Sequence, residues 1–524
     1  MSILKGKLTR FPKKGLQKIL FVAPEAAPFS KAGGLGEVMF ALPRALAEIG
    51  FDVRVMIPRY AGIDLETFNL TMEHEGLAVP TGAENEEDIQ HLICNVRKYT
   101  TNTLTEGMPV TAFFLENAEY YEKRSNIYGY SDDAIRWALL SRGTLEFLKV
   151  SEWIPDVIVS ADWQTGFLPN DLKFLYKHDE RLSKIATIFS IHNLSYQGMF
   201  DHHFVSEMDL DDGHSAIPYF FDERLLKVNG MRRGILHADM INTVSPTYAQ
   251  EIMTKEYGEL LDGLLRERRT RVYGIMNGID YENFNPKTDE FIPKNFDAQS
   301  IEQRKENKKE LQARFGLEQN PESFVIGITS RLTGQKGFDL LMQTADDLLK
   351  EMNIQFIIQG SGDSHFMSYF KELEKRFLGQ VGTNLQFDRI MPKVVFAGSD
   401  AILIPSRFEP SGLVQLEAMH FGAVPIVRKT GGLADTVEDF NQQENMGTGF
   451  VFKEFNATAM MIAIIRAYDA YNNKRIWNGI IKRGMEKDFS WNHAAKEYGH
   501  LFNVVLGIHG EEGVENGSGN GSGN

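Results

Sequence analysis

The sequence is poor in cysteine, in long apolar runs and in net positive charge. Cys94 is the only cysteine among 524 residues, which excludes an intramolecular disulfide framework and a cysteine-rich metal site. No apolar stretch reaches the ~20 residues of a membrane-spanning helix. The 71 acidic residues outnumber the 56 basic ones, for a net charge of −15. We therefore expect a cytoplasmic protein that binds neither nucleic acid nor a membrane, because both polyanions would repel it.

What is present is typical of a folded protein of several domains. The chain is 43% hydrophobic and 24% charged, which excludes global disorder. The length predicts two or three domains at ~100–200 residues each. The first nineteen residues are basic and contain no acid, so residues 1–17 are predicted to be a solvated extension, with a transit peptide as the alternative. The Gly- and Asn-rich end predicts a disordered tail at residues 506–524.

Short runs of apolar, β-branched residues alternate with helix-length segments along the chain. This alternation predicts an α/β fold with open parallel sheets and helices on both faces. A segment rich in Asn, Asp and Pro at residues 275–300 predicts a linker between two such units. The predicted strands lie at residues 18–24, 51–58, 110–115, 156–161 and 185–193, and again at 323–332, 354–363, 401–410 and 423–432.

The linker divides the chain into domains of unequal size. We place the boundary near residues 285–295, which leaves an amino-terminal domain at 18–285 and a carboxy-terminal domain at 286–480. Residues 481–505 are predicted to form a helix that packs back on the first domain. Because ligands of open parallel sheets bind beyond the carboxyl ends of the strands, the loops after the strands should hold the site.

The first such loop is glycine-rich and begins with Lys31. Gly33 and Gly34 allow the backbone to approach a ligand closely, and amide groups at a helix start favour an anionic group. The spacing fits neither the GxGxxG fingerprint nor a Walker A loop. An ordinary glycine-rich turn is the alternative.

Two loops in the second half carry charged residues. Arg331 and Lys336 follow a buried strand. The guanidinium of Arg331 could bind a diphosphate in bidentate fashion, and the ammonium group of Lys336 could add a second positive charge. Alternatively, both side chains lie on a solvated surface. Glu409 follows another strand, and its carboxylate could accept hydrogen bonds from sugar hydroxyls. Glu417, eight residues on, could bind ribose, although two solvated helix residues would produce the same spacing.

Histidines give no metal signal in the sequence. His192 follows a predicted strand with Asn193, where it could bind substrate or satisfy a buried backbone group. His202 and His203 are adjacent, so on regular structure they would face different directions. No HExxH, paired-cysteine or clustered-histidine pattern is present, and no metal is predicted.

Ten segments, in order, resemble the bacterial glycogen synthase and plant starch synthase family. The resemblance runs from about Lys18 to Tyr498. The segments are KILFVAPEAAPFSKAGGLGEV, YSDDAIRWALL, PDVIVSADWQTG, SIHNLSYQG, INTVSPTYAQEI, GIMNGID, SRLTGQKGFDLL, FAGSDAILIPSRFEPSGL, TGGLADTV and FSWNHAA.

The resemblance implies two Rossmann-like domains facing across a cleft, the GT-B glycosyltransferase fold. It implies transfer of glucose from ADP-glucose or UDP-glucose to the non-reducing end of an α-1,4-glucan, with retention and without a cofactor or metal. ADP-glucose is favoured, as in bacterial and plastid members. A phosphorylase would need a pyridoxal phosphate lysine motif, which the sequence lacks, and a nicotinamide oxidoreductase would need the GxGxxG fingerprint.

The residues of the site are carried over position by position. Glu409, Arg331, Lys336 and Asp132 match catalytic positions, Asp132 through the family's YxDN-like segment. The predicted substrate-binding residues are Lys31, Gly33, Gly34, His192, Asn193, Asn277, Phe387, Ser411, Gly412, Leu413, Glu417, Thr430, Gly431 and Gly432.

The sequence departs from the family pattern at several positions. Bacterial members usually carry a histidine that reaches the donor glucose where this chain has Ala161. Ser411 replaces a cysteine, Glu417 replaces a frequent tyrosine, and Glu37 replaces an aspartate. The loss at Ala161 supports the alternative function, a catalytically weak GT-B protein that binds glucan or nucleotide as a regulatory or priming subunit.

Overall fold

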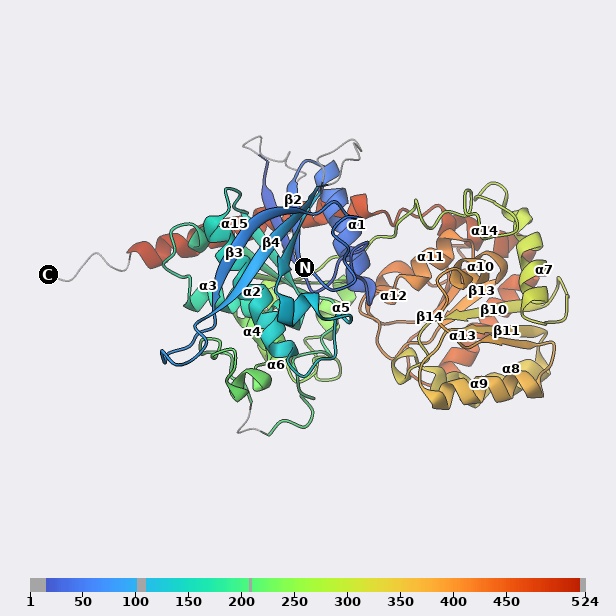
Figure 1. The fold of residues 1–524 in the computed structure, drawn as a ribbon. Helices are drawn as coiled ribbons and strands as arrows, with labels where there is room; N and C mark the ends of the chain where they lie inside the picture. The colour runs from blue at the N-terminus through green and yellow to red at the C-terminus, as the bar shows by residue number, and fades with distance from the viewer. Residues whose placement is uncertain (1–15, 101–109, 207–209, 519–524) are drawn as a thin grey trace.

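The computed structural model describes residues 16–100, 110–206 and 210–518 of the chain. Most of the predicted extension and the last part of the predicted tail lie outside these ranges. The described residues form two lobes that lie side by side (Figure 1), each built around its own sheet. Among them, no helix is both long and apolar enough to span a bilayer.

The first lobe contains a nine-stranded sheet in the order β3-β4-β5-β2-β1-β6-β7-β8-β9. From β5 to β9 the strands are parallel. The strands are β1 (Lys18–Val22), β2 (Asp52–Pro58), β3 (Thr71–Pro80), β4 (His91–Thr100), β5 (Thr111–Glu116), β6 (Val157–Ala161), β7 (Ala186–Ile191), β8 (Met240–Thr243) and β9 (Val272–Gly274).

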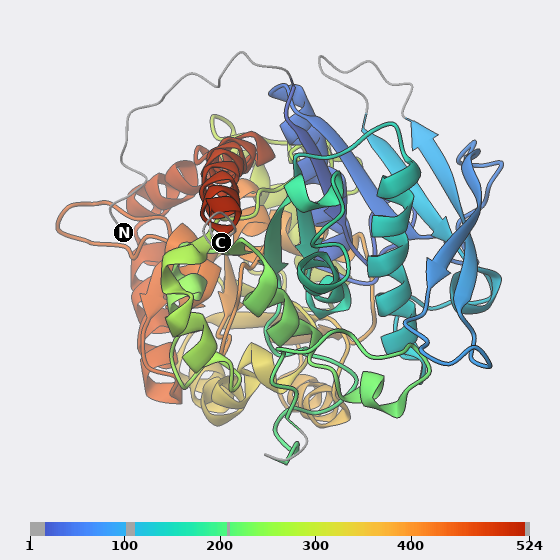
Figure 2. The same cartoon turned by 90° about the vertical axis from the view of Figure 1, so that its left-hand side faces the viewer.

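One edge of this sheet differs from the prediction. β3 and β4 form an antiparallel hairpin, and β4 is also antiparallel to β5, so the sheet is mixed. Figure 2 shows the hairpin at the outer edge of the lobe. Most side chains of β3 are exposed, so this strand has no apolar run of the kind that marks the buried strands.

The helices of the first lobe connect these strands and cover the sheet. The glycine-rich loop ends where α1 begins, at Gly34. The helices are α1 (Gly34–Glu48), α2 (Asp133–Val150), α3 (Phe167–Phe174), α4 (Gly230–His237), α5 (Pro246–Glu251) and α6 (Asp262–Glu267).

The second lobe contains a six-stranded, all-parallel sheet in the order β12-β11-β10-β13-β14-β15. Its strands are β10 (Phe324–Thr329), β11 (Ile354–Gln359), β12 (Val381–Asn384), β13 (Ala401–Ile404), β14 (Val424–Arg428) and β15 (Phe450–Phe452). Its helices are α7 (Arg304–Arg314), α8 (Phe338–Glu351), α9 (Ser364–Arg376), α10 (Met391–Gly398), α11 (Val414–His420), α12 (Gly431–Thr436), α13 (Ala457–Asn472) and α14 (Lys474–Met485).

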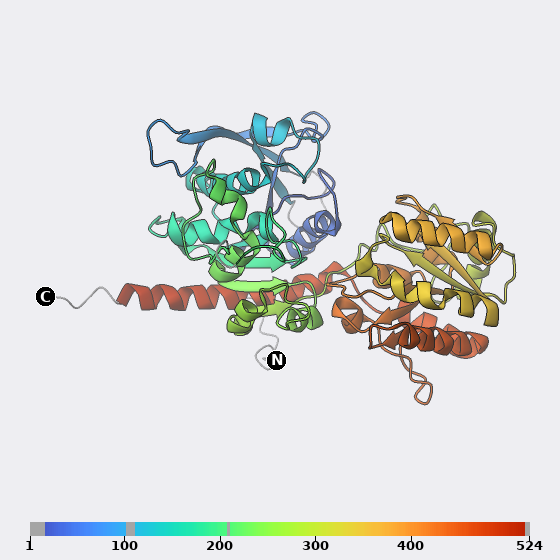
Figure 3. The ribbon, with the colours of Figure 1, turned by 90° about the horizontal axis from the view of Figure 1, so that it is seen from below.

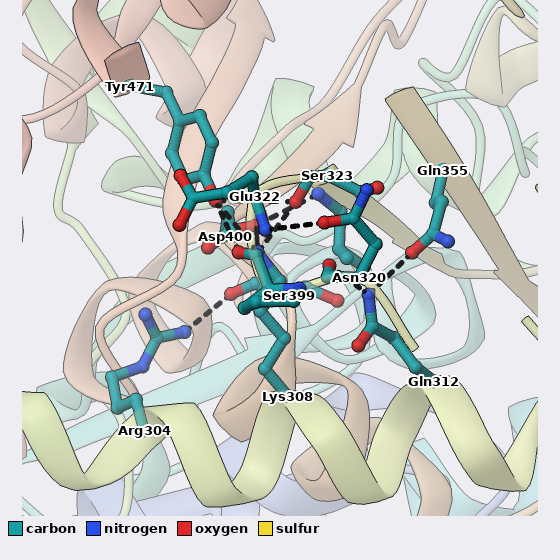
Figure 4. A network of polar contacts seen from close by, with 12 residues as sticks. Arg304, Lys308, Gln312, Asn320, Glu322, Ser323, Gln355, Ser399, Asp400 and Tyr471 are labelled. Atoms are coloured by element: carbon teal, nitrogen blue, oxygen red, sulfur yellow. Dashed lines mark hydrogen bonds and ion pairs between the residues drawn. The ribbon is translucent and has the colours of Figure 1, made fainter. Parts of the chain in front are cut away.

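A buried lysine joins α7 to this second sheet (Figure 4). The Lys308 ammonium donates to the carboxylate of Asp400, which precedes β13, at 2.7 Å, and to the carbonyl of Ser323, which precedes β10, at 2.6 Å. The hydroxyl of Tyr471 on α13 lies 2.8 Å away. These contacts fix the amino ends of the central strands relative to two helices.

The predicted linker is packed rather than free. Ile275 is buried in the first core, whereas Ile279, Ile292 and Phe296 are buried in the second. The Asn and Asp residues that suggested a linker instead form local turns; Asp280, for example, accepts hydrogen bonds from the backbone amides two and three residues on. The change of core therefore falls at residues 275–279, ahead of the predicted boundary near 285–295.

The last helix, α15 (Trp491–Ser518), returns to the first lobe and lies along it (Figure 3). Trp491, Tyr498 and Phe502 are buried in the first core. Residues 506–518, predicted as the beginning of a disordered tail, continue this helix. Among them Ile508 packs against the core, and His509 contacts the carboxylate of Asp239 at 3.1 Å, so the helix has partners beyond residue 505.

Candidate active site

A cleft of about 1570 Å³ lies between the two lobes. Its walls are the loops that follow the carboxyl ends of β1, β6 and β7 in the first sheet and of β10 and β13 in the second. This is the edge at which open parallel sheets bind ligands. The residues of both domains that the sequence singled out can therefore be located relative to one cavity.

Glu25, which is not among the residues predicted from the sequence, organises the glycine-rich loop. Its carboxylate accepts hydrogen bonds from the amides of Ala32, Gly33 and Gly36, the last two at 3.3 Å. Burial raises the pKa of Glu25. The amides that were predicted to face a ligand's anionic group are thus directed at a side chain of the loop itself. The sequence shows only its place as the first charged residue after the first strand, which does not reveal the amides that it binds.

The glycines of this loop line the cleft, but its lysine does not. Gly33 and Gly34 are among the lining residues. Lys31 instead pairs with Glu37, one turn into α1, and both side chains are about 40% exposed (42% and 41%). In this arrangement the Lys31 ammonium group binds Glu37, and its contact with the donor stays a prediction.

Asp162 binds backbone amides of the loop after β7, as Glu25 does in the glycine-rich loop. Its carboxylate accepts hydrogen bonds from the amides of His192 at 2.7 Å and Asn193 at 3.2 Å, and all three residues line the cleft. Burial raises the pKa of Asp162 to about 7 and lowers the pKa of His192 to about 4. His192 is therefore a neutral imidazole at neutral pH, and its Nε2 lies 3.0 Å from the hydroxyl of Ser190.

On the opposite wall a lysine and a glutamate form an ion pair. Lys336 donates to Glu409 Oε2 at 2.5 Å, and the hydroxyl of Ser406 donates to the same oxygen at 3.0 Å. Arg331 lines the cleft beside them and is exposed to it. Arg331 and Lys336 follow β10 and Glu409 follows β13, and all three line the same cleft, as the sequence predicted.

Several polar atoms of the cleft are buried without a hydrogen-bond partner among the described residues. Ser411 lies in a turn with Gly412 and Leu413, and all three line the cavity. Unpaired buried polar atoms in a cavity are usually satisfied by a bound polar ligand or by water. The lining atoms of this kind are Gln164 Oε1, Asn277 Oδ1, Thr329 Oγ1, Ser411 Oγ and Gln415 Oε1.

Like Lys31, three further predicted residues, Asp132, Phe387 and Glu417, lie outside the cleft lining. Asp132 instead accepts a hydrogen bond from Arg124 at 2.6 Å, and the next residue, Asp133, lines the cleft. Phe387 is 78% exposed, away from the cavity. Glu417 is half-buried on α11, where desolvation, followed by the charge of Glu37, raises its pKa to about 8. The predicted binding of ribose by Glu417 therefore stays a prediction.

The Thr-Gly-Gly segment at the start of α12 joins the two domains. Glu251 on α5 accepts hydrogen bonds from the Thr430 hydroxyl at 2.9 Å and from the Gly431 amide at 3.1 Å. A Cβ on Gly431 or Gly432 would overlap the carbonyl oxygens of Glu409 and Ser411, at 1.9 and 1.7 Å. The glycines are therefore required by backbone packing against the Glu409 turn, and none of the three residues lines the cleft.

His202 and His203 both point toward one carboxylate, an arrangement to which the prediction for regular structure does not apply. Their ring centroids are 4.1 Å apart, and both Nε2 atoms contact Glu259. They lie in a loop without regular structure, so the alternation expected of a strand does not apply. Both histidines line the cleft.

Comparison with known proteins identifies the family. A model of the starch synthase catalytic domain matches residues 18–267, and a model of glycosyl transferases group 1 matches residues 309–479. The glycogen synthase of Clostridium beijerinckii is 41% identical over 494 residues, covering 94% of this chain and 99% of that protein. The chain belongs to the glycogen synthase and starch synthase family. The glycogen synthase of Thermosipho africanus is 39% identical over 499 residues, covering 93% and 99%.

Solved structures place this glycogen synthase family member in the GT-B fold. The catalytic domain of starch synthase IV from Arabidopsis thaliana, bound to ADP and acarbose, has a TM-score of 0.79 at 30% identity and covers 94% of this chain and all of that one (100%). A sucrose-phosphate synthase from Thermosynechococcus elongatus, at 16% identity and a TM-score of 0.53, shares the fold alone. The predicted family and the predicted GT-B glycosyltransferase architecture are both confirmed.

Proposed function

We propose that the cleft transfers glucose from ADP-glucose, in preference to UDP-glucose, to the non-reducing end of an α-1,4-glucan with retention of configuration. The observation that carries the proposal is the convergence of Arg331, Lys336 and Glu409 in a cleft of a chain that is 41% identical to a glycogen synthase over 94% of its length. The ADP bound to the Arabidopsis starch synthase supports the choice of donor.

The charged residues of the second domain fit a departing diphosphate. Negative charge builds on the leaving group during transfer, and preorganised cations in a cleft stabilise it more strongly than water does. Arg331 and Lys336 supply two positive charges, so we propose that no metal or cofactor is needed. Glu409 lies where a carboxylate would support an oxocarbenium-like sugar, and Lys336 would exchange this carboxylate for phosphate as the donor binds.

The first domain supplies the other half of the transfer. Neutral His192 and Asn193 are held by Asp162 against the cavity, where they can bind sugar hydroxyls. We propose that the acceptor attacks on the face from which the diphosphate leaves, which retains the configuration, and that apposition of the domains excludes water that would hydrolyse the donor.

One position favours a second candidate function, a catalytically weak protein that binds glucan or nucleotide. Ala161 is fully buried at the end of β6, directly before Asp162, and offers no side-chain hydrogen bond. If Ala161 lacks a contact with the donor, Ala161→His should raise kcat/KM. An unchanged kcat/KM would show that no donor contact is missing at this position.

Incubation with glycogen and radiolabelled ADP-glucose or UDP-glucose, in parallel, tests the proposal. Label is expected in the polymer, more from ADP-glucose, and β-amylase should release it because the new residues are α-1,4-linked at non-reducing ends. Label from UDP-glucose alone would overturn the donor assignment. Calorimetric binding of ADP-glucose with no label from either donor would overturn the transferase and support the binding protein.

A further inference from the structure

Four side chains on the first-domain wall of the cleft converge, namely Asp201, His202, His203 and Glu259. The first three follow one another in the loop after β7, and Glu259 lies between α5 and α6. His202 Nε2 lies 2.9 Å, and His203 Nε2 3.2 Å, from the same carboxylate oxygen, Glu259 Oε2. Ligand atoms of the three consecutive residues lie within 4.8 Å of one another. We call this group the histidine cluster.

Both ring nitrogens of His203 face carboxylates in this arrangement. Its Nδ1 lies 3.0 Å from Asp201 Oδ1, while its Nε2 faces Glu259. A neutral imidazole carries a single N–H and can satisfy only one of the two carboxylates. With the proton on Nδ1, directed at Asp201, the Nε2 lone pair faces Glu259, which favours a cation between them. A carboxylate that orients a metal-binding histidine through its other nitrogen is a recurrent feature of metal sites.

The spacing and charge fit a divalent transition-metal ion. Metal–nitrogen and metal–oxygen bonds of ~2.0–2.1 Å in a tetrahedron place the ligand atoms about 3.3 Å apart, close to the separations of Glu259 Oε2 from the two imidazoles. Two carboxylates and two neutral histidines carry a charge of −2.

Glu259 is held for this position by contacts of its own. Glu259 and Leu260 have left-handed φ angles of 49° and 64°, a conformation that costs free energy in residues other than glycine. Gln197 donates to the Glu259 carbonyl at 2.7 Å, and the Ser195 hydroxyl lies 3.4 Å from Glu259 Oε1. His202 is only 7% exposed, so one imidazole is largely preordered.

We propose that His202, His203 and Glu259 bind a divalent transition-metal ion of the Zn²⁺ class, with Asp201 orienting His203. Imidazole ligands favour such ions over Mg²⁺ and Ca²⁺, which prefer all-oxygen sites. Because Asp201, His202 and His203 line the cleft, the remaining coordination position faces the cavity. The ion joins the loop after β7 to the chain at Glu259 and so stiffens the wall that carries His192 and Asn193. It lies apart from the predicted diphosphate site and is no part of the proposed transfer step.

Titration of the EDTA-treated full chain with Zn²⁺, followed by calorimetry and by the thermal unfolding midpoint, tests the site. We expect one ion per chain, a rise in Tm with Zn²⁺ and none with Mg²⁺. His203→Ala should abolish the rise, and Asp201→Asn should weaken binding 10- to 100-fold, roughly the loss typical of orienting carboxylates. The control is His214→Ala, since His214 is exposed and not part of the cluster.

Visible absorption of the Co²⁺-loaded chain provides a readout of ligation that does not depend on activity. A d–d band in the wild type and in His214→Ala that is lost in His203→Ala would support the assignment. Because the His203 side chain is 56% exposed, its removal should leave the Tm of the metal-free chain unchanged. Equal Zn²⁺ affinity in the wild type and His203→Ala, or no binding by the wild type, would overturn the proposal.

Discussion

Carboxylates that accept backbone amides shape both loops on the first-domain side of the cleft. Glu25 collects three amides of the glycine-rich loop, and Asp162 collects those of His192 and Asn193. Asp162 itself has a φ of 57°, a strained value for a residue with a side chain. Loop shape and the ionisation of buried groups are therefore coupled in this wall of the cleft.

Asp162 should make stability depend on pH. Its folded pKa of about 7 lies above the ordinary 3.8, so between these pH values the folded chain holds a proton that the unfolded chain has lost. The free energy of unfolding therefore falls as pH rises through this window. Asp162→Asn keeps an acceptor oxygen but does not titrate, and it should gain stability relative to wild type from pH 4 to 7, by up to about 4 kcal/mol.

His192 should change the free energy of unfolding with pH in the opposite direction, so it serves as a control. Its folded pKa of about 4 lies below the ordinary 6.5, so its contribution to stability rises with pH between these values. His192→Gln should therefore lose stability relative to wild type over that range. Urea unfolding at several pH values measures the stability of both variants. The readout is tryptophan fluorescence, to which Trp137 and Trp163 in the first core contribute. Parallel pH profiles of the two variants would contradict both assignments.

Lys336 should matter for turnover far more than for folding. If it neutralises the leaving diphosphate, Lys336→Ala should lower kcat by roughly 10²- to 10³-fold, the usual cost of removing one group that stabilises transition-state charge. Lys371→Ala is the matched control, because the Lys371 side chain is 57% exposed on α9 of the same domain. Initial rates with ADP-glucose and glycogen measure the effect. Equal rates for the two variants would remove Lys336 from the mechanism.

Residue types and their place after strands were enough to predict that Arg331, Lys336 and Glu409 share one cleft, but not the arrangement of every predicted residue in either domain. Arg331, Lys336 and Glu409 follow continuous apolar strands, and the cleft brings them together. Lys31 has the same kind of position, yet its ammonium binds Glu37, a choice set by side-chain length and local helix geometry. The role of Glu25 depends on amides seven to eleven residues away, which pattern alone does not reveal.

At the level of elements, the strands that a sequence reveals are those buried on both faces. β10 reads FVIGIT, and every residue in it is buried, so an apolar run marks it. β3 reads TMEHEGLAVP, and only Leu77 and Val79 are buried, so its pairing with β4 depends on a sheet edge that forms elsewhere in the chain. Edge strands of this kind are specified by tertiary pairing more than by composition.

The buried lysine of α7 makes a prediction at this level (Figure 4). Lys308→Met would leave the Asp400 carboxylate buried without its cation, at a cost of about 3–5 kcal/mol in the stability of the second domain. Lys309→Met is the matched control, because Lys309 is the next residue of the same helix and is exposed. Thermal unfolding measured by calorimetry separates the domain transitions. A second-domain transition that shifts equally in both variants would contradict the role assigned to Lys308.

At the scale of the whole molecule, hydrogen bonds between α5 and α12 hold the lobes together. Thr247 binds Asp435 through its amide at 2.8 Å and its hydroxyl at 2.6 Å, beside the contact of Glu251 with the Thr430 segment. Arg428 adds a bond to the Tyr257 hydroxyl at 2.9 Å. These bonds join the two lobes directly, so they oppose separation of the lobes.

Loss of the Glu251 carboxylate should open the cleft. Hydrogen bonds to a charged group contribute about 1.5–3 kcal/mol, so Glu251→Ala should favour the open arrangement roughly ten- to hundredfold. We expect a larger radius of gyration by X-ray scattering and more donor hydrolysis per transfer, because water reaches the donor. Glu267→Ala, at an exposed position on α6 of the same lobe, is the control. An unchanged ratio of hydrolysis to transfer in Glu251→Ala would argue that these bonds do not set closure.

The return of α15 to the first lobe has a consequence for how the protein is made. The amino-terminal core lacks Trp491, Tyr498 and Phe502 until the second domain has been synthesised, because the whole second domain is inserted between Ile275 and Trp491. At about 5–20 residues per second, the ribosome needs roughly 10–45 s to cross that insertion. During this interval the second domain can fold completely, while the first exposes the groove that its last helix will fill. The domain that is synthesised first is therefore the one that is finished last.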